Sequence, residues 1–506
     1  MSELKSARVK VIGPPGTGKT RSLVDLVERV QGGDRGVLET LGLERAPLGE
    51  ELAFISLENS AIREILDRRG QNEKAGWIRT LDGVIVRALV VSGKIESKEI
   101  PSPQKIDVIK QRLMKRFRLD ADTLNTHLAE LTRAIHTFQD IEQVLKHNKV
   151  VRAYYAELAK RKMLDYDLAR LRALEYADEI REAIENDEKH DLPRLVVVDE
   201  GQDFSALDWK VLSSLFPSAQ LVVAGDDMQS IFEFRGAKSE IFKNMSAKKV
   251  VLLDKSYRLP KDVIDVAKSF ADATLKYHYE FAAAEDKEAK FFEVDSVKKL
   301  LALVRAALKR CFTVAVLTRR ISTAELLRNV FIRNHIFADT FQQNYASKVH
   351  EVRQLLELVQ KQHKSKRDYE QLVKLTQKLV EDQRVVRYVT ETFKQGQIFW
   401  HRLNSLEIKL RMLKTHIREL VEAYNTSGEG VVVDTMHSAK GREADYVVLV
   451  DDFHSKTPSW TEEARLLYVA LTRAKRGVVF AKIFKKNKLV ELAEEIANEV
   501  ASVRAL

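Results

Sequence analysis

The segment Arg8-Val-Lys-Val-Ile-Gly13-Pro-Pro-Gly-Thr-Gly-Lys-Thr20 decides which fold we expect for this chain. Residues 8–12 have the pattern of a short strand, a glycine-rich loop follows, and residues 19–31 have helical spacing. The loop matches G-x-x-x-x-G-K-[ST], in which backbone N–H groups surround phosphates, the lysine reaches the β and γ phosphates and the last hydroxyl ligates Mg²⁺. We therefore expect ATP to be bound by Gly13, Pro14, Pro15, Gly16, Thr17, Gly18, Lys19 and Thr20.

A second segment, Leu195-Val-Val-Val-Asp-Glu200, has the pattern of a buried strand that ends in two carboxylates. At such a strand end, Asp199 would hold Mg²⁺ and Glu200 would polarise the water that attacks the terminal phosphate. A hydrophobic strand that ends in Asp-Glu is common by itself. In a chain that also carries the glycine-rich loop, it predicts a site that hydrolyses nucleoside triphosphates.

Strand-like and helical stretches alternate along the chain, as is typical of an α/β fold with parallel sheets. In a first lobe, residues 52–57, 195–198 and 221–224 are strand-like and residues 61–69 have helical spacing. In a second lobe we expect the strands Val250–Leu253, Thr313–Leu317, Gly430–Asp434, Tyr446–Val450 and Gly477–Phe480. The expected division is 1–102 and 189–249 for the first lobe, 103–188 for its helical insertion, 250–345 and 427–506 for the second lobe, and 346–426 for a second, reduced helical insertion.

Composition limits the class of protein. The chain has 506 residues, 45% of them hydrophobic, and a formal net charge of +10. A basic excess suits a polyanionic partner such as nucleic acid, although an ordinary solvated surface would also account for it. There is no run of about 20 apolar residues and no apolar signal stretch in Met1–Val11, so we expect neither a membrane span nor a secretion signal.

The single cysteine, Cys311, excludes a disulfide framework and a cysteine-based zinc site. It lies in the apolar run Cys311–Leu317, where we expect it to be a small core residue. Such sparse use of cysteine favours a reducing compartment, hence the cytoplasm.

Several ordered motifs resemble those of superfamily 1 helicases of the UvrD/Rep type. The segment Asp199–Ser205 resembles DE-x-QD, and Ala224–Ala237 resembles GD-x-x-QSI-x-x-FRGA. The later matches are Ser256-Tyr-Arg258, Thr435–Glu443 (TxHxxKGxE) and Glu463–Arg473 (E-x-R-L-x-YVA-x-TR). Leu164-Asp-Tyr-Asp167 resembles the family's return from its first insertion. The resemblance implies two RecA-like P-loop lobes, each with a helical insertion.

The resemblance also implies roles for single residues. Gln229 would sense the γ-phosphate, and Arg258 and Arg473 would reach in from the second lobe as arginine fingers. Tyr257 would stack on adenine, and Glu443 would hydrogen-bond the ribose.

The strand-contacting residues form a second set. Phe232, Phe234 and Arg235 combine aromatic faces with a cation, a pattern that stacks nucleic-acid bases without regard to sequence, although core packing would use the same aromatics. By resemblance, Thr80, Thr435 and His437 would contact the sugar-phosphate backbone.

The chain departs from the family pattern in three places. No glutamine precedes Gly13, where the family has an adenine-reading segment, so other nucleotides could also be substrates. Ser56-Leu-Glu58 and Thr80-Leu-Asp82 stand where the family has T-F-T and T-F-H, which predicts a different grip on bases in the first lobe. The second insertion is short and helical, so strand separation is less strongly indicated than translocation. Its basic cluster could contact duplex or a partner, or be a solvated helix face: Lys361, Lys364, Lys366 and Arg367.

Taken together, these features favour an ATP- and Mg²⁺-dependent DNA helicase or translocase that acts as a monomer on single strands and on junctions with duplex. The resemblance implies 3′ to 5′ movement, and a protein partner could bind through the helical insertions. Two alternatives stay open, an RNA helicase and an ATP-gated nucleic-acid-binding subunit of a larger nuclease or replication complex. A P-loop ATPase without a nucleic-acid role leaves Phe232–Arg235 and Thr435–Glu443 unexplained.

Overall fold

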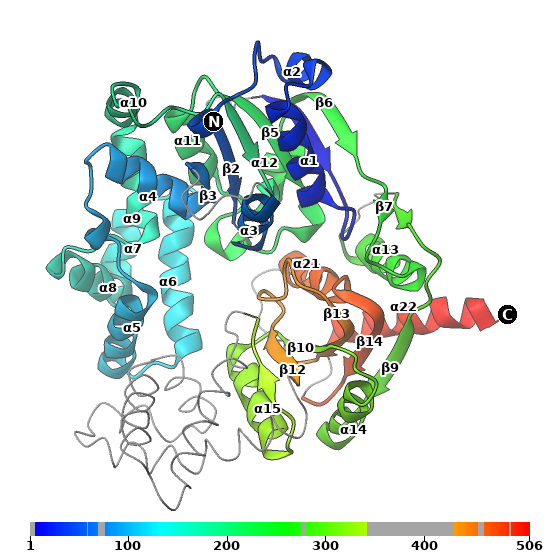
Figure 1. Ribbon diagram of the computed structural model, residues 1–506. Coiled ribbons are helices and arrows are strands. Elements are labelled where there is room, and N and C mark those ends of the chain that lie inside the picture. Colours follow the sequence, from blue (N-terminus) through cyan, green and yellow to red (C-terminus); the bar gives the residue numbers. More distant parts are fainter. Residues whose placement is uncertain are drawn as a thin grey trace, which may run out of the picture. The chain divides into compact units, whose positions relative to one another are not determined.

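The computed structural model describes residues 6–57, 59–68, 76–275, 280–341, 430–453, 460–484 and 487–505. Two compact units divide the chain (Figure 1). The first lobe comprises Met1–Arg258 with Tyr277–Ala284, and the second lobe comprises Leu259–Lys276 with Glu285–Leu506. Each is an α/β lobe of the RecA-like type, built on a six-stranded parallel sheet.

The first lobe is built on a sheet of order β3-β2-β4-β5-β1-β6. Its strands are β1 (Ala7–Ile12), β2 (Leu52–Ser56), β3 (Trp77–Thr80), β4 (Leu195–Val198), β5 (Gln220–Gly225) and β6 (Ala247–Leu252). The helices packed with it are α1 (Lys19–Gln31), α2 (Arg35–Leu41), α3 (Asn59–Arg68), α4 (Leu81–Val91), α11 (Ala206–Leu215) and α12 (Ser239–Asn244). Short 3₁₀ turns are η1 (Gly49–Glu51), η2 (Ser97–Glu99), η3 (Gly201–Asp203), η4 (Asp227–Gln229) and η5 (Glu233–Arg235).

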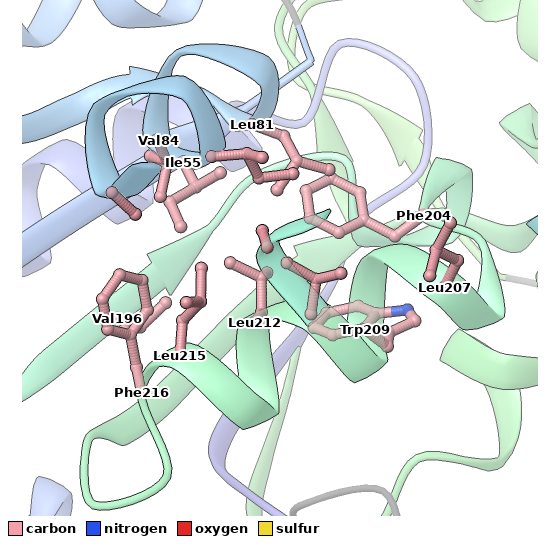
Figure 2. Packing of buried hydrophobic residues seen from close by; sticks show 14 of the residues in the cluster. Ile55, Leu81, Val84, Val196, Phe204, Leu207, Trp209, Leu212, Leu215 and Phe216 are labelled. Atoms are coloured by element: carbon pink, nitrogen blue, oxygen red, sulfur yellow. The ribbon is translucent and has the colours of Figure 1, made fainter. Parts of the chain in front are cut away.

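Both faces of this sheet are buried, which explains why its central strands are continuous apolar runs. In β4, Val196 and Val198 point into one hydrophobic core, and Leu195 and Val197 point into the other. Figure 2 shows the first of these cores, where Phe204 and residues of α11 such as Trp209 and Leu212 pack against strand side chains. Successive apolar side chains of β4 therefore point to opposite faces of the sheet, and both faces are covered by helices.

The insertion of the first lobe is helical, as the sequence predicts. It contains α5 (Pro103–Phe117), α6 (Ala121–His136), α7 (Ile141–His147), α8 (Lys149–Lys160), α9 (Tyr166–Glu175) and α10 (Ala177–Glu185). Side chains of Asp120, Asp140, Asn148 and Asp165 accept hydrogen bonds from the first turns of α6, α7, α8 and α9, which sets where these helices begin. Helices α5, α6 and α8 share a small core of their own. By contrast, α9 and α10 contribute Ala169, Ala173, Ile180 and Ile184 to the hydrophobic core against the sheet. The insertion therefore shares a core with the first lobe.

The second lobe has a sheet of order β11-β12-β10-β13-β14-β9. Its strands are β9 (Lys290–Val294), β10 (Val314–Thr318), β11 (Ala338–Asp339), β12 (Val431–Thr435), β13 (Ala444–Val450) and β14 (Ala474–Ala481). The helices are α13 (Lys261–Leu275), α14 (Val297–Leu308), α15 (Ile321–Arg333), α21 (Trp460–Leu471) and α22 (Lys488–Ala505). A small separate pairing, which belongs to the first lobe, joins β7 (Lys255–Ser256) to β8 (Ala282–Ala283).

Most strands expected from the sequence are present, but three expectations are wrong. Val250–Leu253 was expected in the second lobe, whereas β6 pairs with β1 at the edge of the first sheet. The chain then stays with the first lobe as far as Arg258, so Tyr257 and Arg258 also belong to the first lobe. Cys311 is exposed and has φ 58°, because the chain reverses there between α14 and β10.

Three strands of the six-stranded sheets were not predicted, and some predictions fall outside the described residues. Strands β3, β9 and β11 were not foreseen, because each is short or carries mixed polar residues. The second insertion and its basic cluster at residues 361–367 lie outside the described residues. Within the described ranges, no helix has the length and hydropathy needed to cross a bilayer.

A buried ion network joins the insertion to the sheet layer of the first lobe. The side chain of Arg170, on α9, is 1% exposed and lies 2.7 Å from Asp208 on α11 and 2.7 Å from Asp82 on α4. Asp167 lies 3.9 Å from the same guanidinium. Burial works against these charges. Nevertheless, Arg170 and His136 hold the pKa of Asp208 below its ordinary value, and the carboxylates raise the pKa of Arg170. The charges therefore depend on one another in the folded chain.

Replacing Arg170 with methionine should destabilise the first lobe by about 3–5 kcal/mol, because it leaves three carboxylates without their cation. The matched control is Arg172→Met on the same helix, where the side chain is 35% exposed and lies 3.7 Å from Glu99. That variant should cost less than about 1 kcal/mol. Urea unfolding followed by tryptophan fluorescence measures both, since Trp77 and Trp209 lie in the first-lobe core. Equal losses in the two variants would contradict a special role for the network.

Candidate nucleotide-binding site and nucleic-acid interface

The glycine-rich loop lies between the carboxyl end of β1 and the start of α1. Its first residue, Gly13, donates a backbone hydrogen bond of 3.2 Å to the carbonyl of Gly225 at the end of β5. Gly16 has φ 75°, and a Cβ at this position would lie 2.6 Å from Ser256 Oγ, so only glycine fits. Helix α1 then begins at Lys19 and directs its unpaired N–H groups towards the loop, an arrangement that binds anions such as phosphate.

The polar side chains expected at the phosphates lie together. Lys19 is buried and donates to the carbonyl of Gly13 at 2.9 Å, and its Nζ lies 3.8 Å from Glu200 Oε1. Thr20 Oγ1 donates to Asp199 Oδ2 at 2.8 Å. A hydroxyl and a carboxylate this close present the hard oxygen ligands that Mg²⁺ takes alongside its waters. The residues present therefore fit a magnesium–nucleotide complex.

The second carboxylate, Glu200, is held in an unusual conformation. It has φ 55°, in the left-handed region that non-glycine residues seldom adopt. Its carboxylate accepts a hydrogen bond from Gln202 Nε2, and the other amide atom, Gln202 Oε1, accepts from the backbone N–H of Asp226 at 3.0 Å. Gln202 thus connects the strand end that carries Glu200 with the strand end that carries Asp226.

Gln229, expected to sense the γ-phosphate, is buried beside this connection. Its side-chain amide donates to Asp226 Oδ2 at 2.7 Å, and the other carboxylate oxygen accepts from the N–H of Met228 at 3.0 Å. Burial raises the pKa of Asp226 to about 6, with the nearby charge of Lys19 opposing the shift and that of Asp227 adding to it. Asp226 and Gln202 were in quoted motifs but had no expected role, because only the tertiary structure shows what they contact.

The segment Ser256–Arg258 packs on the glycine-rich loop within the first lobe. Ser256 Oγ donates to the carbonyl of Pro15 at 2.9 Å, and the N–H of Tyr257 donates to the carbonyl of Gly16 at 2.9 Å. The side chain of Tyr257 is 74% exposed, so its ring presents a free face next to the phosphate loop. This is compatible with the stacking on adenine that the sequence predicts.

Other expected site residues lie in the second lobe. Arg473 is buried at the end of α21, where its Nε donates to the carbonyl of Val469 at 2.8 Å. Glu443 is exposed and pairs with Lys475 at 2.6 Å. The structure thus assigns these two side chains local partners, and their expected roles on the nucleotide stay predictions.

The second lobe also holds two expected strand contacts, at the end of β12. Thr435 is buried, and its hydroxyl lies 3.0 Å from that of Ser438. Burial and the neighbouring Arg319 lower the pKa of His437 to about 3, so this imidazole is neutral at physiological pH. His437 could therefore serve as a hydrogen-bonding group on a strand but not as a cation.

The aromatic element of the first lobe has the features of a base-stacking surface. The rings of Phe232 and Phe234 are 6.0 Å apart, and the guanidinium of Arg235 lies 5.9 Å from the ring of Phe232. Phe234 is 38% exposed, whereas full core packing would have buried it. Thr80 lies elsewhere in the lobe, where its hydroxyl accepts from the N–H of Gly83 at 3.2 Å and caps α4. This threonine therefore has a structural role besides the expected backbone contact.

Two family models match the chain. The UvrD/REP helicase N-terminal domain matches residues 46–249, and the UvrD-like helicase C-terminal domain matches residues 430–481. The two matches together cover about half of the chain and include the carboxylate strand, the aromatic element and most of the second-lobe motifs.

Curated relatives point the same way. A probable DNA helicase II homolog of Mycoplasma capricolum is 24% identical over 293 residues, 52% of this chain and 38% of the relative. A protein of the same description from Mycoplasma genitalium is 21% identical over 384 residues, 58% of this chain and 55% of the relative. The matches thus span about half or less of each relative's length. Among solved structures, one described as the structure of PRRSV helicase aligns with 94% of this chain and 52% of its own, at 9% identity and a TM-score of 0.35, which is too low to establish a shared fold.

The raised pKa of Asp226 makes a prediction about stability and pH. The folded chain binds this proton more tightly than the unfolded chain, so the group contributes stability below about pH 4 that is lost as pH rises through about 6. An amide at this position loses one of the two hydrogen bonds that the carboxylate accepts, a cost that does not depend on pH. Relative to the wild-type chain, the stability of Asp226→Asn should therefore be about 1 kcal/mol more favourable at pH 8 than at pH 5. Thermal unfolding at the two pH values measures this. A stability difference that is the same at both would show that Asp226 is already ionised without penalty.

Proposed function

Because the chain belongs to the UvrD/Rep-like helicase family, we propose that it is an ATP-driven motor that moves along single-stranded DNA and opens duplexes. The observation that carries the proposal is that two sets of functional side chains lie in the first lobe. The groups expected at the phosphates, at magnesium and at the attacking water (Lys19, Thr20, Asp199 and Glu200) lie in the same compact unit as the aromatic pair Phe232 and Phe234, of which Phe234 is exposed.

In the proposed hydrolysis step, the groups of the first lobe have separate tasks. The N–H groups of the loop and Lys19 hold the phosphates, and Thr20 and Asp199 hold Mg²⁺, which offsets phosphate charge. Glu200 orients the attacking water and accepts its proton. Gln202 holds Glu200 in its strained conformation through their hydrogen bond. Gln229 would detect whether the γ-phosphate is present.

The remaining expected residues complete the proposal. Arg258 and Arg473 would stabilise negative charge in the transition state, and Tyr257 and Glu443 would contact adenine and ribose. Release of phosphate removes contacts that depend on it, and this loss can be coupled to stepping of the two lobes along a strand. The family resemblance favours 3′ to 5′ movement. The proposed substrates are single strands and their junctions with duplex DNA.

The second candidate function, an ATP-gated nucleic-acid-binding subunit, is favoured by one observation. In place of a neutral or basic residue, the element after Thr80 carries Asp82, whose side chain is 31% exposed and lies 2.7 Å from Arg170. The first lobe thus lacks a contact that relatives of this pattern would direct to a strand. Such a subunit would bind DNA and hydrolyse ATP but would not open duplexes alone.

The proposed function is tested by the ATPase rate with and without single-stranded DNA, followed by unwinding of forked duplexes with a 3′ or a 5′ tail. Strong stimulation with unwinding from the 3′ tail is expected. Glu200→Gln should lower the stimulated kcat by about 10²–10⁴-fold, because it removes the general base. The matched control Glu240→Gln makes the same chemical change at an exposed position of the first lobe and should leave kcat unchanged.

The outcomes separate the candidates. Stimulation without unwinding would favour the ATP-gated subunit. If RNA stimulates in place of DNA, the substrate class is wrong, and if neither does, the motor proposal fails.

The aromatic element makes its own prediction. Phe234→Ala should weaken single-stranded DNA binding by about 5–150-fold, since each stacked base contributes about 1–3 kcal/mol. The loss should be similar for different base sequences. Phe292→Ala, at a phenylalanine of the second lobe that is 39% exposed, serves as the control and should bind normally. Fluorescence anisotropy with labelled oligonucleotides gives the dissociation constant of each variant. An affinity of Phe234→Ala equal to that of the wild-type chain would exclude stacking on Phe234.

A further inference from the structure

We infer that the buried ion network around Arg170 couples strand binding to ATP hydrolysis, with His136 and Arg170 as positioning residues. The inference rests on the proposed function and names a regulatory connection within it. Three elements of the first lobe meet in the network. They are the segment that follows the carboxylates Asp199 and Glu200, the end of α6 on which the aromatic element packs, and the start of α4 beside Thr80.

One connection runs from the carboxylate segment to His136. The chain continues from Glu200 through η3 to Ser205, whose hydroxyl caps α11 and donates to Asp208 at 2.8 Å. The imidazole of His136, at the end of α6, lies 2.8 Å from this hydroxyl through Nδ1. Its Nε2 lies 2.9 Å from Asp167. His136 therefore joins the segment after Glu200 to the carboxylates around Arg170.

The aromatic element is seated on the same histidine. Gly236 ends η5 with φ 89°, and a Cβ there would lie 2.7 Å from His136 Cβ. The next residue, Ala237, forms an antiparallel bridge with Ser205. The backbone at the end of η5 thus packs on His136 and pairs with Ser205. Because η5 carries Phe234 and Arg235, a displacement of His136 or Ser205 would be felt by the turn that carries the aromatic element.

The opposite end of the network reaches the other strand contact of the first lobe. Asp82 lies in the first turn of α4, two residues after Thr80, and its carboxylate lies 2.7 Å from Arg170 Nη2. Thr132 Oγ1 also donates to Asp167 at 2.7 Å, which ties α6 to the same carboxylates. Residues that adjoin both expected strand contacts of the first lobe consequently touch one cluster of charges.

A cluster of this kind transmits displacement because it tolerates few arrangements. Arg170, His136 and Asp208 are almost fully buried, whereas the side chain of Asp82 is 31% exposed. Water screens the buried charges weakly, so breaking one of their pairs leaves a partner charge poorly compensated. Asp167 shows the dependence directly. Burial would raise its pKa, but His136 and Arg170 hold it below the ordinary value. Apolar residues would stabilise such an interface equally well. The placement of this network between the carboxylates and both strand contacts therefore indicates a role in positioning.

The test compares two single substitutions in the full-length chain. His136→Gln keeps an amide near Asp167 and loses the contact with Ser205, whereas Asp82→Asn keeps the shape and removes the charge that faces Arg170. Each should leave the DNA-free kcat and the KM for ATP within about twofold and reduce the stimulation by single-stranded DNA by about 5–150-fold, the range of typical coupling between sites. The control is Glu157→Gln, which breaks the pairing with Arg161 on α8 outside the network, and it should respond to DNA normally.

The outcomes are distinct. If the wild-type ATPase is stimulated and both variants are stimulated equally well, the coupling is refuted while the proposed function stands. Loss of DNA-free activity in parallel with stimulation would show a merely structural network and would also refute it. Tighter DNA binding by Asp82→Asn with full stimulation would mean that Asp82 acts by direct repulsion of phosphates. If the wild type itself ignores DNA, the proposed function and the coupling both fail.

Discussion

The parallel register of β4, β5 and β1 is the constraint on which the candidate site depends. Val198 pairs with Val223, and Val9 pairs with Val222, so the three strands end at one edge of the sheet. Parallel strands present their carboxyl ends at the same edge of a sheet. Three segments that are far apart in the sequence therefore meet there: the glycine-rich loop, the carboxylates Asp199 and Glu200, and the turn at Asp226. Residues separated by 179 positions, Thr20 and Asp199, thereby reach hydrogen-bond distance. The buried apolar faces of β4 supply the energy that holds this arrangement, and the polar groups at its end contribute chemistry rather than stability.

Polar interactions determine how the parts of the first lobe are connected. Gln202 bridges Glu200 and Asp226 within the edge of the sheet, and the network of Arg170, His136 and three aspartates joins the sheet to the helical insertion. Both are buried, and a buried polar group is costly unless it is satisfied. These groups accept few geometries, because hydrogen bonds and buried ion pairs depend on distance and direction. The aromatic element lies in a short 3₁₀ turn, and the end of this turn packs on His136 of α6, which itself belongs to the polar network.

The second lobe repeats the parallel architecture with a different use of its edge. Its sheet carries Thr435 at the end of β12 and no glycine-rich loop before α14. Arg473 and Glu443 have partners within their own lobe. The family assignment therefore depends on the two matched regions and on the first-lobe site. The nucleotide contacts proposed for Arg473 and Glu443 stay predictions.

Local pattern was enough for several features of this protein. The loop Gly13–Thr20 and the helix that follows it, the apolar strand before Asp199 and the helical insertion all follow from short-range rules, since periodicity and glycine positions act within a few residues. Pattern failed where the outcome depends on distant partners. Val250–Leu253 looks like any strand, and only its pairing with β1 assigns it to the first sheet. Cys311 lies in an apolar run, yet a chain reversal turns it to the surface. No spacing in the chain indicates that Asp82, His136 and Arg170 meet, because charged residues are ordinarily solvated and become buried only where the folded chain supplies partners from other helices.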